Sequence, residues 1–169
     1  MELTQEQKGK IGETAVMLEL LKKGFNVINI NNSYPNYKNA DLICMNANNG
    51  KSVMIQVKTG TTHNILTGFT SELDGTIQKL EESIIGPWVF VYMPDDKMSN
   101  MEFYILTREE VIELIYSSNK WYATEYYRKL KKKYPVGVYV DWLEGGSSKA
   151  TKLHPELLLS GKKMSSIKN

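Results

Sequence analysis

The sequence predicts an α/β domain in which a central mixed β-sheet is flanked by helices. An opening segment has the cap and the spacing of an amphipathic helix, and several short apolar segments with strand-like alternation follow it. One further helix lies between the strands, and others precede a last strand. This order of elements is typical of a mixed sheet with helices packed on it.

The first helix is predicted from its cap. Thr4 and Gln7 have capping-box spacing, and the helix is expected to run to about Lys23, where Gly24 ends it. Four apolar residues at helical spacing form one stripe along it, namely Ile11, Ala15, Leu18 and Leu21.

Alternating apolar residues and turn residues predict the strands. The expected strands are 25–30, 40–45, 52–58, 88–93, 102–106 and 136–142. The connector from Asn46 to Gly50 supplies residues that tolerate positive φ, which a hairpin between the second and third strands requires. Residues 59–70 are predicted to form a polar loop.

Three more helices are predicted. They cover residues 71–85, residues 107–117 with Thr107 and Glu110 as a capping box, and a basic segment at 121–133. We therefore expect a single domain over residues 1–142 and a basic, partly flexible tail over 143–169.

Composition indicates a cytoplasmic protein that needs no covalent staples. The 169 residues are 41% hydrophobic, which is enough for a core, and Cys44 is the only cysteine, so no internal disulfide can form. We find neither a secretion-signal pattern at the start nor an apolar run of the roughly 20 residues that a membrane helix needs.

Charge is distributed unevenly along the chain. Residues 1–119 hold 10 Lys and Arg against 15 Asp and Glu, a net of −5, whereas residues 120–169 hold 11 against 4, a net of +7. A basic C-terminal third favours an anionic partner, most commonly nucleic acid, although a solvated basic helix explains the charge equally well. The densest basic run comprises Arg128, Lys129, Lys131, Lys132 and Lys133.

The third strand carries the residues that indicate chemistry. With a side-chain period of two, Gln56 and Lys58 emerge together from one face near the strand end. A lysine at the end of a buried strand is costly unless an anionic group meets it. If the hairpin pairs as expected, Asp41 at the start of the preceding strand lies beside Gln56 and Lys58.

Glu13 is a fourth candidate. Its helical neighbours Val16, Met17 and Leu20 are apolar, so its carboxylate lies on an apolar face and needs a partner there. Considered singly, each of the four residues has an ordinary structural explanation. Their order along the chain, between apolar strands, favours a shared site.

These residues resemble the PD-(D/E)xK nuclease superfamily, in particular its restriction-endonuclease-like and Holliday-junction-resolvase-like branches. The resemblance covers about residues 8–60 and rests on Gly12-Glu13 in the helix, on 39–42 (Asn-Ala-Asp-Leu) and on 55–59 (Ile-Gln-Val-Lys-Thr). Two departures are visible: Asn39-Ala40-Asp41 replaces Pro-Asp, and Gln56 replaces the usual acidic residue. An amide oxygen brings no charge, so Mg²⁺ binding is expected to be weaker.

The resemblance implies a metal-dependent DNA endonuclease of restriction, repair or mobile-element type. Asp41, the Gln56 side chain, the Val57 carbonyl and Glu13 would hold Mg²⁺, for which Mn²⁺ would substitute. Lys58 would orient the attacking water and offset charge in the transition state. DNA is the expected partner, contacted by the basic run, and self-association into a homodimer stays open.

Two alternatives remain at this point. The chain could be a nuclease-fold module with weakened or lost catalysis that binds nucleic acid or a protein, or an interaction protein with no nucleic-acid role. A zinc site is disfavoured because His63 and His154 are far apart and lack Cys or acidic neighbours. Cys44, within an apolar strand, is expected to be a core residue.

Overall fold

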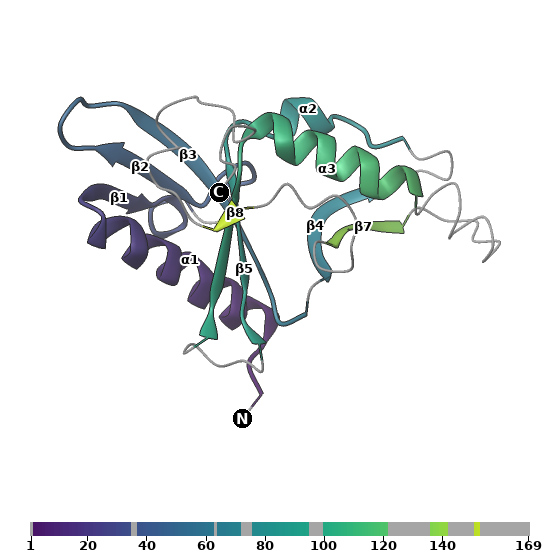
Figure 1. Ribbon diagram of the computed structural model, residues 1–169, viewed down its shortest axis with the longest axis horizontal. Coiled ribbons are helices and arrows are strands. Elements are labelled where there is room, and N and C mark those ends of the chain that lie inside the picture. Colours follow the sequence, from purple (N-terminus) through teal and green to yellow (C-terminus); the bar gives the residue numbers. More distant parts are fainter. Residues whose placement is uncertain are drawn as a thin grey trace.

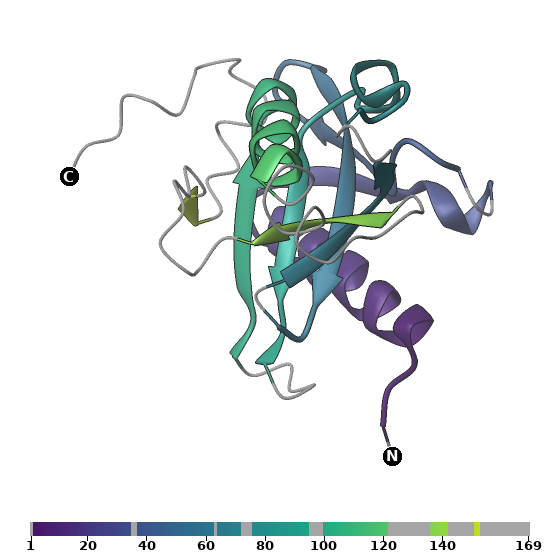
Figure 2. The same ribbon diagram turned by 90° about the vertical axis from the view of Figure 1, so that its right-hand side faces the viewer.

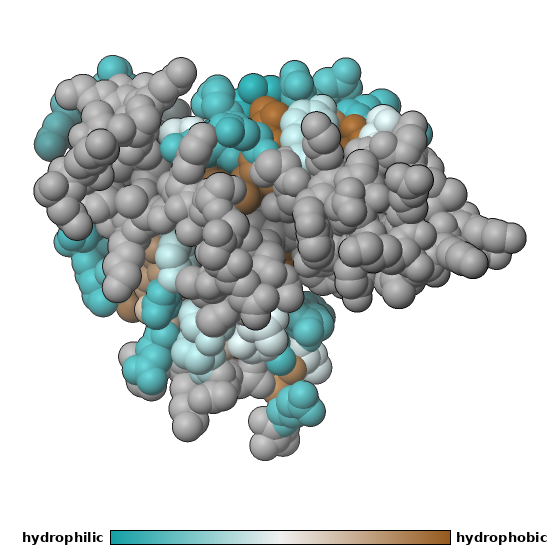
Figure 3. Space-filling view, turned by 45° about the vertical axis from the view of Figure 1, so that its right-hand side comes forward, coloured by the Kyte–Doolittle hydropathy of each residue, from teal (hydrophilic) through white to brown (hydrophobic). Residues whose placement is uncertain are grey.

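The computed structural model confirms the predicted mixed α/β fold (Figure 1). The structure describes residues 2–34, 37–62, 64–71, 76–94, 100–121, 136–141 and 151–152. None of the helices within these ranges is long and apolar enough to cross a membrane. On the face seen in Figure 3, the apolar residues among those described form small patches between hydrophilic ones.

A six-stranded mixed sheet forms the centre, in the order β1-β2-β3-β5-β6-β8. Its strands are β1 (Phe25–Asn29), β2 (Leu42–Asn46), β3 (Ser52–Gly60), β5 (Trp88–Tyr92), β6 (Glu102–Leu106) and β8 (Thr151–Lys152). The first three pair antiparallel, β3 and β5 pair in parallel, and β5–β6–β8 are again antiparallel. β3 is therefore the strand at which the antiparallel N-terminal part meets the rest of the sheet.

The remaining elements include a small second sheet. It consists of β4 (Asn64–Ser71) paired antiparallel with β7 (Val136–Asp141). The helices are α1 (Gln5–Lys22), η1 (Ile30–Asn32), α2 (Leu80–Ser83) and α3 (Arg108–Trp121).

Two apolar clusters fix these layers. One joins α1 to β2, β3 and β5 through residues such as Val16, Leu42 and Ile55. The other joins β4, α2 and α3 to Trp88 and Phe90 of β5. α1 therefore covers one face of the main sheet, whereas α2, α3 and β4 cover the other (Figures 1 and 2).

The predicted helix caps are confirmed. The Thr4 hydroxyl accepts a hydrogen bond from the Gln7 N–H, and the Gln7 side chain accepts one from the Thr4 N–H. α1 ends at Lys22, and Gly24, just beyond its C-cap Lys23, has a φ of +84°. Thr107 and Glu110 form the same reciprocal pair at the start of α3.

The buried face of α1 differs from the apolar stripe seen in the sequence. Val16 and Leu20 are fully buried against the sheet, together with Gly12. Leu18 and Leu21 of the stripe are 50% and 44% exposed. The face that contacts the sheet is therefore the one predicted to carry Glu13, with its apolar neighbours Val16 and Leu20, rather than the stripe of Leu18 and Leu21.

The prediction of a polar loop at residues 59–70 is wrong. β3 continues to Gly60, and β4 begins at Asn64. In β4 the buried Ile65 and Thr67 alternate with the exposed Leu66. A strand is predicted from buried apolar residues that alternate with exposed polar ones. β4 was not predicted because Thr67 points inward and Leu66 points outward, which is the reverse of that pattern.

The helix predicted over residues 71–85 is also wrong, since Ser71 belongs to β4 and, within the described residues 76–85, the helix covers only Leu80–Ser83. Ile77, Leu80 and Ile84 are buried at a spacing that imitates a helix. Lys79 has a φ of +53°, in the left-handed region that an α-helix cannot include.

The structure describes only part of the C-terminal region for which elements were predicted. The strand expected at 136–142 is present as β7, but it pairs with β4 rather than with the main sheet. The charged residues of the helix expected at 121–133 lie outside the described residues. In the predicted tail, the two residues of β8 are described.

Candidate metal and phosphodiester site

Asp41 is placed by the β2–β3 hairpin. β2 pairs with β3 up to Leu42 opposite Ile55, and the Asp41 N–H still donates to the Ile55 carbonyl at 2.8 Å. The Asp41 carbonyl accepts from the Ile30 N–H instead of from β3. Its carboxylate Oδ2 therefore accepts the next β3 N–H, that of Val57, at 2.7 Å. The buried carboxylate thus extends the hydrogen-bonding ladder where the β2 backbone leaves it.

Gln56 also contacts this carboxylate. Its side chain is buried, and its amide Nε2 donates to Asp41 Oδ2. Because Nε2 faces Asp41, the amide oxygen Oε1 is directed away from Asp41, and no described residue donates a hydrogen bond to Oε1. The Val57 carbonyl projects to the same edge as its N–H, because both groups of a strand residue point to the same neighbour. The Val57 carbonyl is therefore an uncharged oxygen on the Asp41 side of β3, whereas the Gln56 amide faces Asp41 with its nitrogen.

Glu13 reaches this group from α1. Its Oε2 accepts from the Asn29 side-chain amide at 3.0 Å, and its Oε1 accepts from Asn31 Nδ2 at 3.5 Å. Asn31 Nδ2 also donates to Asp41 Oδ1 at 3.0 Å. Since one nitrogen joins both carboxylates, the two oxygens are at most 6.5 Å apart, the sum of 3.0 and 3.5 Å. Within that upper limit, the two carboxylates are near enough to share a cation, one of them directly and the other through a water of the cation.

Gly12 allows Glu13 to come this close. A Cβ at Gly12 would lie 1.9 Å from Thr59 Oγ1 of β3 and 3.0 Å from its Cβ. Only a residue without a side chain permits α1 to approach β3 at this distance. The Gly12-Glu13 pair therefore combines a close helix–strand contact with a carboxylate at its edge.

Asn29 and Asn31 were missed as site residues. Asn29 lies within the strand predicted at 25–30, and Asn31 follows it, so neither was marked as part of a site. The signal that could have identified them is the β1–β2 register, in which Asn29 lies opposite Leu42, next to Asp41. That register cannot be read from local sequence.

Lys58 lies close to Asp41 but forms no ion pair with a described carboxylate. Its ammonium Nζ lies 5.3 Å from the centre of the Trp88 ring, and a Cβ at Gly68 of β4 would be 3.6 Å from it. Burial lowers the pKa of Lys58, and the negative charge of Asp41 partly opposes this shift. The ammonium thus lies near an aromatic face and the charge of Asp41, and no carboxylate in the described part of the chain pairs with it directly.

The oxygen atoms of these residues fit a divalent cation, but they predict weak binding. The side-chain hydrogen bonds to Glu13 and Asp41 come from amide groups, which carry no positive charge of their own. Asn29 Oδ1 is buried and accepts no hydrogen bond from the described residues, at a cost of about 1–3 kcal/mol that a cation or its water would remove. Within the described ranges, no three or more His, Cys, Asp or Glu residues group as metal ligands. Amide and carbonyl oxygens must therefore complete the set.

Other sequence candidates are resolved differently. Cys44 is fully buried in the core, and burial raises the pKa of its thiol to about 11, which makes it unreactive. His63 and His154 lie outside the described residues, as do the basic residues Arg128, Lys129, Lys131, Lys132 and Lys133.

Comparison with known proteins adds no assignment. No protein-family model, curated protein or solved structure matches the chain.

Proposed function

We propose that the chain is a metal-dependent endonuclease that hydrolyses phosphodiester bonds in DNA, of restriction, repair or mobile-element type. One observation carries the proposal. Two carboxylates, Glu13 and Asp41, lie within 6.5 Å, the sum of 3.0 and 3.5 Å, and share an amide donor beside a lysine that no described carboxylate neutralises. The resemblance of these residues to the PD-(D/E)xK pattern supports the same reading.

The residues that would hold Mg²⁺ or Mn²⁺ are Asp41, Glu13, Gln56 through Oε1 and Val57 through its carbonyl. A bound cation would polarise the scissile phosphate and lower the pKa of a water molecule. The chain itself contributes orientation: the Val57 N–H and the Gln56 and Asn31 amides fix the Asp41 carboxylate at both of its oxygens. A fixed carboxylate loses little freedom when it binds a cation.

Lys58 would meet the substrate. Its ammonium donates to no described carboxylate, so its donors are available to a phosphate oxygen or to the attacking water. The lowered pKa reflects a poorly solvated ammonium, and an anionic phosphate would stabilise it strongly in such surroundings. Lys58 would therefore offset the charge that develops on the phosphorane-like transition state.

The test combines metal binding with DNA cleavage. Calorimetric titration with Mn²⁺ is expected to show binding that Asp41→Asn abolishes and Lys58→Met retains. Both variants are expected to lose cleavage of duplex, single-stranded or branched DNA. Lys51→Met is the matched control, because Lys51 is exposed at the hairpin turn, remote from the site. Cleavage that survives in both site variants would refute the assignment.

The basic run would supply DNA contacts beyond the cation. Reversing Lys131, Lys132 and Lys133 to Glu is expected to weaken DNA binding and to leave Mn²⁺ affinity unchanged. Each lost phosphate contact lowers the slope of log K against log salt by about 0.9. An unchanged slope would show that these lysines do not touch the phosphates.

A non-catalytic binding module is the second candidate, and Gln56 favours it. With an amide in place of an acid, two carboxylates of the described residues face the site, and Gln56 donates a hydrogen bond to one of them. This candidate predicts DNA or protein binding without Mn²⁺ binding and without cleavage under any metal. The calorimetric titration separates the two functions before any substrate is known.

A further inference from the structure

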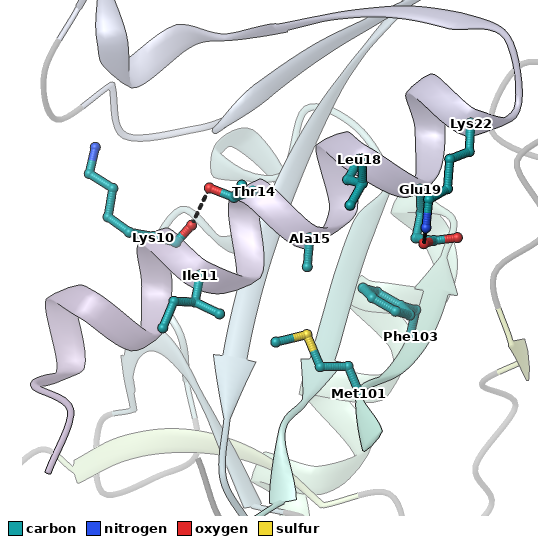
Figure 4. A pocket seen from close by; sticks show the side chains of 9 residues that line it. All are labelled: Lys10, Ile11, Thr14, Ala15, Leu18, Glu19, Lys22, Met101 and Phe103. Atoms are coloured by element: carbon teal, nitrogen blue, oxygen red, sulfur yellow. Dashed lines mark hydrogen bonds and ion pairs between the residues drawn. The ribbon is translucent and has the colours of Figure 1, made fainter. Parts of the chain in front are cut away.

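An apolar groove lies along α1, between this helix and the start of β6 (Figure 4). Its volume is about 480 Å³. Figure 4 shows Ala15 and Leu18 of α1 on one side of the groove and Met101 and Phe103 on the other. The full lining comprises Lys10, Ile11, Thr14, Ala15, Leu18, Glu19, Lys22, Met101 and Phe103.

The groove leaves apolar surface open to solvent. Leu18 is 50% exposed, and Ile11, Met101 and Phe103, which line the groove with it, are partly buried. Met101 and Phe103 also pack on the cluster that joins α1 to the main sheet, so the groove is continuous with the core. The stripe of Ile11, Ala15 and Leu18 that the sequence shows along this helix therefore has room for a further apolar segment.

The course of β8 leads the chain toward this groove. β8 pairs with β6 through Ile105 opposite Thr151 and Tyr104 opposite Lys152. Because the two strands are antiparallel, the chain after Lys152 leaves in the direction of Phe103 and then Met101. These are the two residues that line the groove on the side opposite α1.

The segment that follows β8 carries the residues that such a surface requires. Residues 153–169 lie outside the described ranges, and their sequence includes Leu153 and the run Leu157-Leu158-Leu159. From Lys152 to Leu157 an extended chain spans about 17 Å, whereas three positions along β6 span about 10 Å. The leucine run can therefore reach beyond Met101 and turn onto α1. Three consecutive leucines are stabilised strongly when an apolar surface covers them.

We propose that the occupant of the groove is the C-terminal segment of the same chain, residues 153–159, with the leucines of 157–159 packed on the stripe of α1. The length and the direction of the chain beyond β8 carry the proposal, together with the half-exposed leucine that the segment would cover. α1 would then be held between the main sheet on one side and this segment on the other. The proposal does not depend on the proposed function.

Disulfide crosslinking in the full chain tests the contact. Leu18→Cys is combined in turn with Leu157→Cys, Leu158→Cys and Leu159→Cys, and at least one pair is expected to crosslink within the chain under mild oxidation. Ile28→Cys replaces Leu18→Cys in the control pairs, because Ile28 is 59% exposed and its strand neighbour Val27 faces the α1 cluster, which places Ile28 on the other side of the sheet. Docking raises the effective concentration of the two thiols, so the Leu18 pair is expected to form about tenfold faster or more. Cys44 is buried and is not expected to compete.

A double-variant comparison tests the same contact without cysteines. Leu18→Asp and Leu158→Asp are each expected to lower Tm by about 2–4 °C or more. Since both remove one contact, the combined variant is expected to lose about as much as one of them. Ile167→Asp, in the same tail but outside residues 153–159, is the control and is expected to leave Tm unchanged.

The two experiments overturn the proposal in separate ways. Equal crosslinking of the Leu18 and Ile28 pairs would show that the leucines do not rest on α1. Fully additive losses of Tm would show that Leu18 and Leu158 act apart. Crosslinks that form between chains, seen as a dimer on a non-reducing gel, would assign the groove to a second copy and would also overturn the proposal.

Discussion

Gly12→Ala is the substitution that tests most directly how the candidate site is assembled. α1 crosses β3 at Gly12, where an added methyl carbon would lie 1.9 Å from Thr59 Oγ1 and 3.0 Å from Thr59 Cβ. Both distances are shorter than van der Waals contact. The methyl group can be accommodated only if α1 moves away from β3 or Thr59 changes conformation, and either change moves Glu13 relative to Asp41.

Gly9→Ala provides the matched control, since a Cβ at Gly9 has no atom within 4 Å. Replacing glycine by alanine inside a helix stabilises it by about 0.8–1 kcal/mol. Because both variants gain this term, their difference in the free energy of unfolding isolates the steric term. Overpacking of this kind typically costs about 1–3 kcal/mol. Gly12→Ala is therefore expected to be less stable than Gly9→Ala by that amount.

Urea and thermal unfolding followed by circular dichroism would measure this difference, with each 1 kcal/mol shifting Tm by about 2–4 °C. Thr59→Ala removes Oγ1, the atom nearest to the new methyl group at 1.9 Å, together with Cγ2 at 3.1 Å, so Gly12→Ala/Thr59→Ala is expected to recover most of the loss. Mn²⁺ affinity is expected to fall in Gly12→Ala and not in Gly9→Ala. Equal stability of the two glycine variants would refute the close-contact reasoning.

Three further substitutions or measurements probe the site and the core. Gln56→Glu is expected to destabilise the metal-free protein by about 1–3 kcal/mol, because a carboxylate replaces the donor to Asp41, and to bind Mn²⁺ more tightly by calorimetry. The pKa of Lys58 is lower in the folded chain than the ordinary value of 10.5, so between these two pKa values the unfolded chain binds more protons than the folded one. The free energy of unfolding is therefore expected to rise with pH across this window. Urea unfolding should show the rise in the wild type but not in Lys58→Met. Cys44, whose pKa is raised to about 11, is expected to react with a thiol reagent at pH 8 only after denaturant unfolds the chain, and rapid labelling of the native protein would contradict its burial.

The sequence predicts the N-terminal half of the fold well, because its signals are local. The capping box at Thr4, the hairpin turn ending at Gly50 and the alternation in β3 each act within a few residues. The proximity of Asp41 to Gln56 follows from that hairpin alone. These contacts need no information from distant parts of the chain.

Features that depend on distant contacts could not be predicted. β4 was missed because Thr67 is buried and Leu66 is exposed, a pattern set by its packing on the core around Trp88 rather than by its own polarity. Asn31 lies between Glu13 and Asp41 only because β1 pairs with β2 and α1 packs beside them. Local patterns identified Glu13, Asp41, Gln56 and Lys58, but not the Asn29 and Asn31 amides that donate to the two carboxylates.

The hairpin between β2 and β3 also limits how this chain can change length. Gly50, at a φ of +69°, closes the turn that sets which residue of β3 lies opposite Leu42. Successive β3 side chains point to opposite faces, so a one-residue insertion that shifted the strand would turn Lys58 toward α1 and bring Val57 beneath β4. Two-residue insertions would restore the faces but move Gln56 away from Asp41. Insertions and deletions are therefore compatible with the site only if they bulge out of the turn and leave the strand pairing unchanged.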